Sequence, residues 1–396
     1  MTSSSQTSPA QPINDRIEAL DLLRGVALLG IYLSIIPSFN SSLIHGNPLA
    51  GESGLFARLW GAFESLIISK RFIGMFSLLF GVGVAIQYQN FVRRGQAFGP
   101  YFVRRMLILG ALGAINTSFF FHVEILMVYA VFGLLAMMFY RAPTKFTLGL
   151  AAASFALWGS IFEVTLRPLV FQVFRWVPRQ YSFERIHEIY SQGPILEQIK
   201  LRWIEYGTIY ADNAFHLGMS LAMILAGVLI GKHQLHVRFI ENLAAYQKAV
   251  GYAGAYSLGF LFYGLAQGQG DFLFIDRPVA TVFYLVFQPC SMFVYIYLAA
   301  LFCTRIGSGN LLRRALINNG KLSLTGYMGG AAAFALIFYY PGAALCFQYA
   351  GPALSVIAVA VYAGFTIFSS LWLTRFRRGP MEWLYRRLAY GTLRSG

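Results

Sequence analysis

The chain has 396 residues, of which 57% are hydrophobic and only 12% are charged, whereas soluble domains carry about 25% charged residues. This composition excludes an ordinary soluble protein and favours one whose helices face lipid. The net charge of +15 does not indicate nucleic-acid binding, because the basic residues lie in short clusters between apolar runs. The three cysteines have no metal-ligand spacing, so we expect no disulfide framework and no metal site.

The first stretch is rich in Ser, Thr, Pro and Gln and lacks the basic start of a signal peptide, which predicts a disordered cytoplasmic tail over 1–19. About ten apolar runs of roughly 17–25 residues follow, each long enough to cross a hydrocarbon core of ~30 Å. The sequence therefore predicts an all-α, polytopic transmembrane bundle with membrane helices in 20–166 and 214–374. The expected spans are 20–40, 72–92, 103–121, 124–141, 146–166, 214–231, 247–267, 279–303, 322–340 and 352–374.

Lys and Arg alternate between loops in a way that predicts the orientation of the bundle. If the N-terminus is cytoplasmic, four inner loops and the tail 375–396 are rich in Lys and Arg, and the short outer loops are nearly free of them. Positive residues favour the cytoplasmic side, so we expect both termini there, in a bacterial inner membrane. The outer segment 167–213 is also basic, but it is apolar and aromatic at near-helical spacing. It predicts amphipathic helices on the outer membrane surface or roofing a cavity.

Four motifs give the chain a family likeness. They are Asp21-x-x-Arg24-Gly25 at the start of the first span, Phe76-Ser77-Leu78-Leu79-Phe80-Gly81, Gly320-Lys321-x-Ser323-Leu324-Thr325-x-Tyr327, and Gly379-Pro380-x-Glu382-Trp383. In order and spacing they resemble the bacterial DUF418 (YeiB-like) family of multi-pass membrane proteins. The opening Arg-Gly pair also resembles the start of membrane acyltransferases, including the acyltransferase-3 group.

This resemblance implies an acyltransferase-like membrane fold and a reaction in which an acyl group, such as acetyl, passes from acyl-CoA to a hydroxyl or amine of a sugar-like or other small acceptor. Transport has also been proposed for members of the family. The bilayer and a small or lipid-linked acceptor are the expected partners, nucleic acid is not, and a homo-oligomer is left open. No P-loop, zinc motif or dinucleotide fingerprint is evident, so transport driven by ATP on this chain alone is not expected.

The chain departs from the resembled family at polar positions. Ile35 stands where Asn is usual, Asn116 where His is usual, Gly326 where Asn is usual and Gly330 where Gln is usual. The usual Gly-Asp-Ile-Leu is Val123-Glu124-Ile125-Leu126. These losses favour a third alternative, besides an enzyme and a transporter or flippase of an anionic molecule. The chain would then be a catalytically reduced partner subunit.

The donor site is expected at the inner end of the first span. Asp21 and Arg24 are three residues apart and share a helix face, and Arg forks suit phosphate. We interpret Asp21, Arg24 and Gly25, with Arg104 and Arg105 of the next inner loop, as candidates to bind acyl-CoA. A positive-inside anchor with a local ion pair is the alternative.

Acid and base candidates lie at the opposite end. His122 and Glu124 could form an acid–base pair if His122 is still in the loop. Asp212 and His216 are four residues apart and share a helix face, so they could form a second pair. The alternative for Asp212 is that it caps the helix. His45 follows the first span, where related acetyltransferases use a His. Thr325 and Tyr327 are expected to pack, and Gly379, Pro380, Glu382 and Trp383 to anchor a basic amphipathic segment on the inner surface.

Overall fold

The computed structural model describes residues 11–42, 59–61, 63–68, 71–157, 181–212, 214–266, 278–349 and 351–390. Within these ranges the chain is helical and has no β-strand. The helices are α1 (Gln11–Phe39), η2 (Glu64–Ile68), α3 (Arg71–Arg93), α4 (Phe98–Phe119), α5 (Leu126–Tyr140), α6 (Thr144–Leu157), α8 (Phe183–Gln192), α9 (Ile195–Asp212), α10 (Ala214–Lys232), α11 (Leu235–Glu241), η5 (Leu243–Tyr246), α12 (Gln247–Ala266), α13 (Pro278–Arg305), α14 (Leu311–Lys321), α15 (Ser323–Phe338), α16 (Pro352–Arg375) and α17 (Pro380–Tyr390).

Five helices in the described ranges are long and apolar enough to cross a membrane, and the number rises to seven if each of two bent pairs is one span. This makes the chain a helical membrane protein. Each of the ten expected ranges overlaps a helix, but α5, α6 and α15 have only 15, 14 and 16 described residues. In the second bent pair, α14 and α15 meet at 87°, so α14 does not continue the direction of α15.

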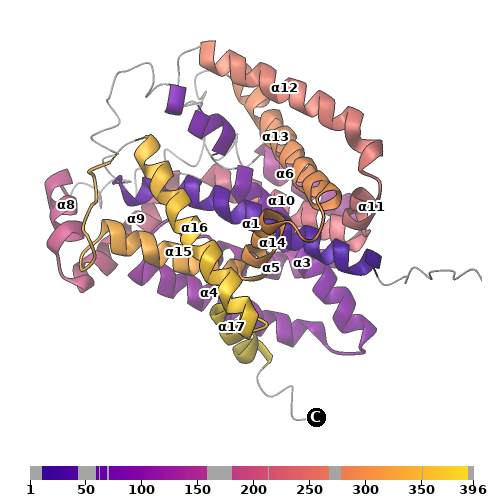
Figure 1. Cartoon of the computed structure of the whole chain (residues 1–396), viewed down its shortest axis with the longest axis horizontal. Helices are drawn as coiled ribbons and strands as arrows, with labels where there is room; N and C mark the ends of the chain where they lie inside the picture. Colours follow the sequence, from indigo (N-terminus) through magenta and orange to yellow (C-terminus); the bar gives the residue numbers. More distant parts are fainter. Residues whose placement is uncertain are drawn as a thin grey trace, which may run out of the picture.

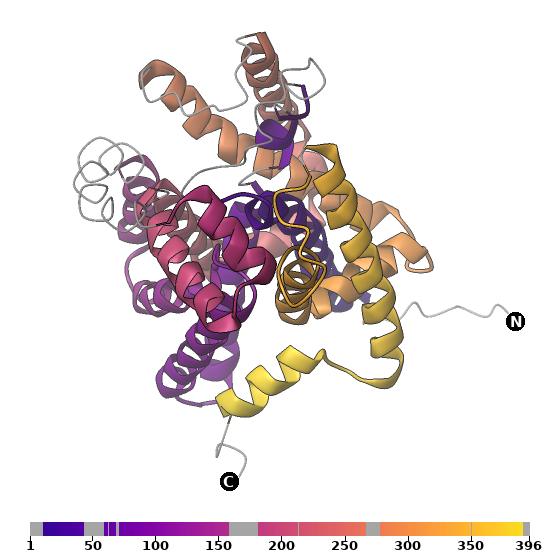
Figure 2. The ribbon, with the colours of Figure 1, turned by 90° about the vertical axis from the view of Figure 1, so that its left-hand side faces the viewer.

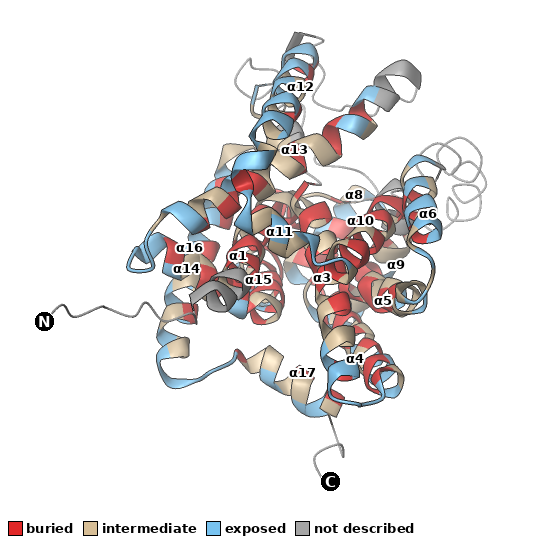
Figure 3. Cartoon of the chain, turned by 90° about the vertical axis from the view of Figure 1, so that its right-hand side faces the viewer, coloured by how far each residue is buried: buried red, intermediate tan, exposed pale blue. Residues whose placement is uncertain are grey.

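Helix α1 is the centre of the bundle, with α3, α13, α14, α15 and α16 packed around it (Figure 1). Figure 3 shows buried residues gathered on α1, α3, α10 and α15, whereas α12 is largely exposed. The exposed side chains of α12 include Tyr252, Leu258 and Phe262. An apolar outer face is what a helix in lipid presents, because lipid gives no hydrophobic drive to bury it.

Two helix crossings are so close that only glycine fits. A Cβ on Gly25 would lie 2.0 Å from the carbonyl oxygen of Leu316, and one on Gly320 would lie 1.7 Å from that of Asp21. Between α3 and α10, a Cβ on Gly81 would lie 2.0 Å from a backbone oxygen of the other helix. Small residues let membrane helices approach closely, so three of the motif glycines hold the bundle together.

Candidate functional site

A cavity of about 460 Å³ opens at the end of the bundle where α17 lies. Figure 2 shows α17 crossing below the bundle from the end of α16 to α4. Helices α1, α3, α4, α5, α15 and α17 supply the walls, and this volume is typical of a small-molecule site. We call it the basic cavity, because its lining includes Arg24, Arg94, Arg105, Lys321 and Arg386.

The cationic groups of the basic cavity outnumber the anionic ones. Five Arg and Lys side chains face two carboxylates, Asp21 and Glu382. The Arg24 Nη1 atom donates to Asp21 Oδ1 over 2.8 Å, which fixes the Arg24 side chain while leaving it 30% exposed. Arg105 donates to the Tyr101 hydroxyl over 3.1 Å and lies over the Tyr385 ring. The remaining positive charge suits a phosphate or another anion.

Two of the family motifs meet at the bend between α14 and α15. Glu382 Oε1 accepts from the backbone N–H groups of Leu324 and Thr325 over 2.7 and 3.0 Å, and its Oε2 accepts from the Thr325 hydroxyl. The first N–H groups of a helix lack partners within it, so a carboxylate there caps α15. A Cβ added to Gly379 would lie 2.1 Å from Glu382 Oε2, so a larger residue there would displace the capping carboxylate. Pro380 begins α17, and Trp383 is 51% exposed.

The deep end of the basic cavity is formed by Leu126, Tyr129 and Tyr327. Glu124 lies behind this wall and is fully buried. Its carboxyl group accepts from the Asn116 side chain and the Leu126 N–H, and it is hydrogen-bonded to the Tyr327 hydroxyl. Two of the departures from the usual family residues, Asn116 and Glu124, are therefore in direct contact with each other.

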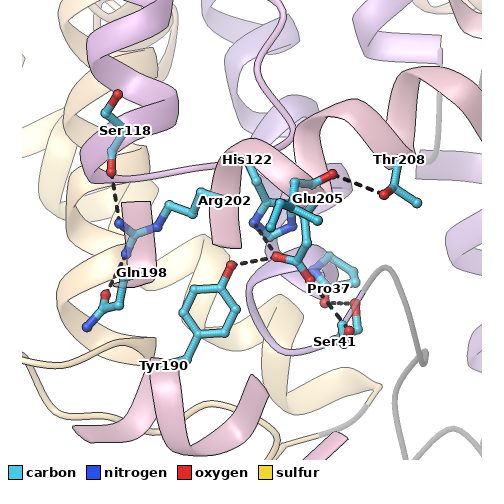
Figure 4. Close-up of polar contacts among 11 residues, drawn as sticks. Pro37, Ser41, Ser118, His122, Tyr190, Gln198, Arg202, Glu205 and Thr208 are labelled. Carbon is cyan, nitrogen blue, oxygen red and sulfur yellow. Dashed lines mark hydrogen bonds and ion pairs between the residues drawn. The ribbon is translucent and has the colours of Figure 1, made fainter. Parts of the chain in front are cut away.

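His122 is also fully buried, but its carboxylate neighbour is Glu205 on α9, with Nδ1 3.5 Å from Glu205 Oε2 (Figure 4). No contact joins His122 to Glu124 among the hydrogen bonds and ion pairs described here, so the geometry favours a pair other than the expected one. The Tyr190 hydroxyl also donates to Glu205 Oε2, over 2.5 Å. Neither Nδ1 nor Nε2 of His122 has a hydrogen-bond partner in the described part of the chain, so the 3.5 Å contact with Glu205 is an ion-pair distance.

Arg202 completes this His122 cluster, which we define as His122, Tyr190, Gln198, Arg202 and Glu205. The Arg202 guanidinium donates to the Ser118 carbonyl over 3.0 Å and to Gln198 Oε1 over 2.8 Å. It also lies within 5.2 Å of the Tyr339 ring centre. A buried cation thus has bonded partners on α4 and α9 and an aromatic face beside it.

The cluster was not foreseen because α9 has its polar residues inside. Gln198, Arg202 and Glu205 are buried, whereas Ile195, Leu196 and Trp203 are exposed. The apolar spacing correctly predicted a helix here, but it drew attention to the face that points outward. The spacing of Gln198, Arg202 and Glu205 at i, i+4 and i+7 was the available signal for a buried polar face.

Burial controls the charge of both groups in the connecting segment 120–125. Removal from water, with Arg202 nearby, lowers the pKa of His122 to about 3. Burial raises the pKa of Glu124 to about 8, although the hydrogen bonds from Leu126, Asn116 and Tyr327 oppose the shift. Both groups are thus favoured in their neutral forms near neutral pH.

The other predicted site residues are distributed as follows. Five of them line the basic cavity: Asp21, Arg24, Arg105, Tyr327 and Glu382. Arg104 does not line it and is exposed, and Gly25 packs on α14. Asp212 ends α9 and His216 lies in the first turn of α10, but their side chains, and His45 altogether, lie outside the described residues. Ile35 is buried, and the Tyr32 ring fills the space beside Gly330.

Comparisons with known proteins agree with the motifs. Residues 230–392 match the model of a family described as "Protein of unknown function (DUF418)". The chain is 26% identical to the uncharacterized protein YxaH of Bacillus subtilis, over 95% of each chain. It is 28% identical to the uncharacterized protein YeiB of Escherichia coli, over 96% of this chain and 97% of YeiB. No solved structure matches the chain.

Proposed function

The chain belongs to the DUF418 family, and we propose that this member is a membrane-bound acyltransferase whose acyl-CoA donor enters the basic cavity. The observation that carries the proposal is the excess of cationic side chains in a 460 Å³ cavity with aromatic walls. Phosphate oxygens pair with Arg and Lys, and aromatic rings accept a flat base or an acyl chain. In this proposal Arg24, fixed by Asp21, and Arg105 bind the donor's phosphates.

The proposed orientation follows from charge. The helix ends around the basic cavity carry the Lys- and Arg-rich loops, so the positive-inside tendency assigns them to the cytoplasm, where acyl-CoA is found. We propose about ten spans in a bacterial inner membrane, both termini in the cytoplasm, and an acyltransferase-like arrangement. In this proposal the short apolar helix α5 and the bent pair α14 and α15 each count as a span.

The proposed base is His122, oriented by Glu205. If Nδ1–H faces Glu205, Nε2 carries the lone pair that can accept a proton from an acceptor's hydroxyl or amine. The acceptor's oxygen or nitrogen bonds to the acyl carbon as the bond from that carbon to sulfur breaks, and the thiolate of coenzyme A takes up a proton.

Transport is the second candidate, and one observation favours it. Tyr327 lines the basic cavity, the buried Glu124 is hydrogen-bonded to it from behind, and His122 of the buried cluster is two residues from Glu124. A cavity bordered by buried polar groups is also what one state of a carrier for an anion would present. Such a carrier would move its substrate without forming a modified product.

Calorimetry in nanodiscs tests the donor site, with coenzyme A as the probe. We expect Arg24→Ala and Arg105→Ala each to weaken binding by roughly 10- to 100-fold, because a hydrogen bond to a charged group contributes about 1.5–3 kcal/mol. Arg104→Ala is the matched control, since Arg104 is exposed next to Arg105. Folded protein that does not bind coenzyme A would overturn the donor site, and solute accumulation without a product would establish transport.

A further inference from the structure

Tyr327 is shared between the basic cavity and the buried carboxyl group of Glu124. Its side chain lines the deep end of the cavity. Its hydroxyl is hydrogen-bonded to Glu124 and lies 3.5 Å from the backbone nitrogen of Ile125, which donates to it. One residue of α15 therefore separates a solvent-connected space from a carboxyl group that is 0% exposed.

Burial favours the protonated form of Glu124, and none of the bonding partners described here for its carboxyl group carries a charge. Asn116 from α4, Tyr327 from α15 and the backbone N–H of Leu126 are all uncharged. His122, two residues away in the same connecting segment, is paired with Glu205. Removal from water disfavours the ionised form of a buried carboxyl group, and the raised pKa of Glu124 agrees with this.

A protonated Glu124 also orders the hydroxyl next to it. The Tyr327 oxygen then accepts the proton of Glu124 and the N–H of Ile125, so its own hydrogen points away from both groups. The cavity lies on the other side of Tyr327. This is the arrangement in which a hydroxyl passes a proton on, giving its own hydrogen to one side while it takes one from the other.

We propose that Glu124 is a proton-exchange site that communicates with the basic cavity through the Tyr327 hydroxyl. The transfer is balanced: Glu124 loses a proton to Tyr327 as Tyr327 gives its own to a basic group in the cavity, and the reverse path restores the acid. In the proposed acyl transfer, the thiolate that leaves from the donor would be such a group. The inference rests on the proposed function only for that last step, because the exchange itself requires no acyl donor.

Infrared spectroscopy of the full chain in nanodiscs tests the site, since a protonated carboxyl group has a resolved C=O stretch that shifts in D₂O. We expect Glu124→Gln to remove one such band. In Tyr327→Phe the band should remain, but its exchange on transfer to D₂O should be at least about tenfold slower than in the unaltered protein. Tyr129→Phe is the matched control, because Tyr129 also lines the deep end of the cavity but bonds Ser77, and its exchange rate should be unchanged.

The outcomes separate this inference from the proposed function. If Glu124→Gln removes no band, or if exchange in Tyr327→Phe is as fast as in the unaltered protein, the proposal is overturned. Coenzyme A added to saturation should slow the exchange by covering Tyr327. A normal Tyr327 effect with no response to coenzyme A would keep the proton site and remove the donor.

Discussion

The basic cavity and the His122 cluster both place charged side chains within an apolar bundle, but they differ in what those charges can reach. In the cavity, Arg24 remains 30% exposed and the cationic groups exceed their carboxylate partners. In the cluster, His122 and Glu205 have no exposed side-chain surface, and Glu205 is bonded by Tyr190. The cavity therefore offers charge to a ligand, whereas much of the cluster's hydrogen bonding is already internal, with both ring nitrogens of His122 and Nε of Arg202 as exceptions among the described residues.

The largest expected effect comes from opening the cluster. Arg202→Ala removes the donors to Ser118 and Gln198 and leaves Glu205 buried without this cation nearby. Breaking a buried charge arrangement on one side typically costs about 3–5 kcal/mol. We expect a loss of that size in the free energy of unfolding, measured in detergent with increasing denaturant. Arg104→Ala should change it by less than about 0.5 kcal/mol, and equal effects would show that the cluster is not a stabilising unit.

A second effect is a pH dependence that belongs to Glu124. Its pKa is about 8 in the folded chain and 4.5 ordinarily, so the folded state retains a proton that the unfolded state has lost. The stabilisation is complete below pH 4.5 and is lost as pH rises toward 8, by about 2–3 kcal/mol between pH 5 and 7. His122 acts oppositely, because its lowered pKa makes acid destabilising.

Glu124→Gln isolates the Glu124 contribution, since the amide keeps the shape and His122 is retained. The stability of the unaltered protein relative to this variant should fall as pH rises from 5 to 7, as followed by thermal unfolding in nanodiscs. Parallel curves for the two proteins would mean that Glu124 is ionised in the folded state. That result would also contradict the proton-exchange site.

The glycine crossing under the basic cavity should give a smaller effect. Gly320→Ala places a Cβ 1.7 Å from the Asp21 carbonyl oxygen, so α14 and α1 must separate. Overpacking of this kind lowers the free energy of unfolding by about 1–3 kcal/mol. The separation of α14 from α1 should also move Asp21 and Arg24 and so weaken coenzyme A binding. Gly329→Ala, with nothing within 4 Å of its Cβ, should leave stability equal or raised. Similar results for both variants would contradict the close crossing.

The smallest effect is expected at the cap on α15. Thr325→Val removes the hydroxyl that donates to Glu382 and accepts from the Met381 N–H. Loss of a helix cap costs about 0.5–2 kcal/mol, and we expect thermal unfolding to show a decrease within that range. Thr374→Val is the control, since its hydroxyl bonds only its own helix among the contacts described here. If Thr325→Val and Thr374→Val have the same stability, the Thr325 hydroxyl contributes nothing to the cap, which then consists only of Glu382 and the backbone N–H groups.

Much of the bundle was predictable because membrane helices are defined locally, by length and hydropathy. The helices α3 and α16 lie where the apolar runs predicted them, whereas α1 begins at Gln11, within the stretch that was expected to be a disordered tail. The 87° bend before α15 was not predictable from its apolar run, since the direction of α14 is set by its glycine crossing with α1, which is a distant contact.

The site was predictable only in part, and for the same reason. The spacing of the opening motif predicted that Asp21 and Arg24 share a helix face, and their side chains are in contact, which is local at three residues apart. The pairing of His122 with Glu205 joins residues 83 positions apart, and the cap of Glu382 on α15 joins residues 57 and 58 apart. No local pattern encodes those partners, although each partner is a polar residue in an otherwise apolar setting.

The shortness of α5 and α15 has an electrical consequence. Helices of 15 and 16 residues extend only about 22–24 Å, less than a hydrocarbon core of ~30 Å, and the basic cavity admits solvent along part of that length. A transmembrane voltage falls mainly across the part of a protein that excludes water. The field would then be concentrated on the few side chains beyond Tyr327, and a proton crossing that layer would sense most of the roughly 2.3 kcal/mol that each 100 mV supplies.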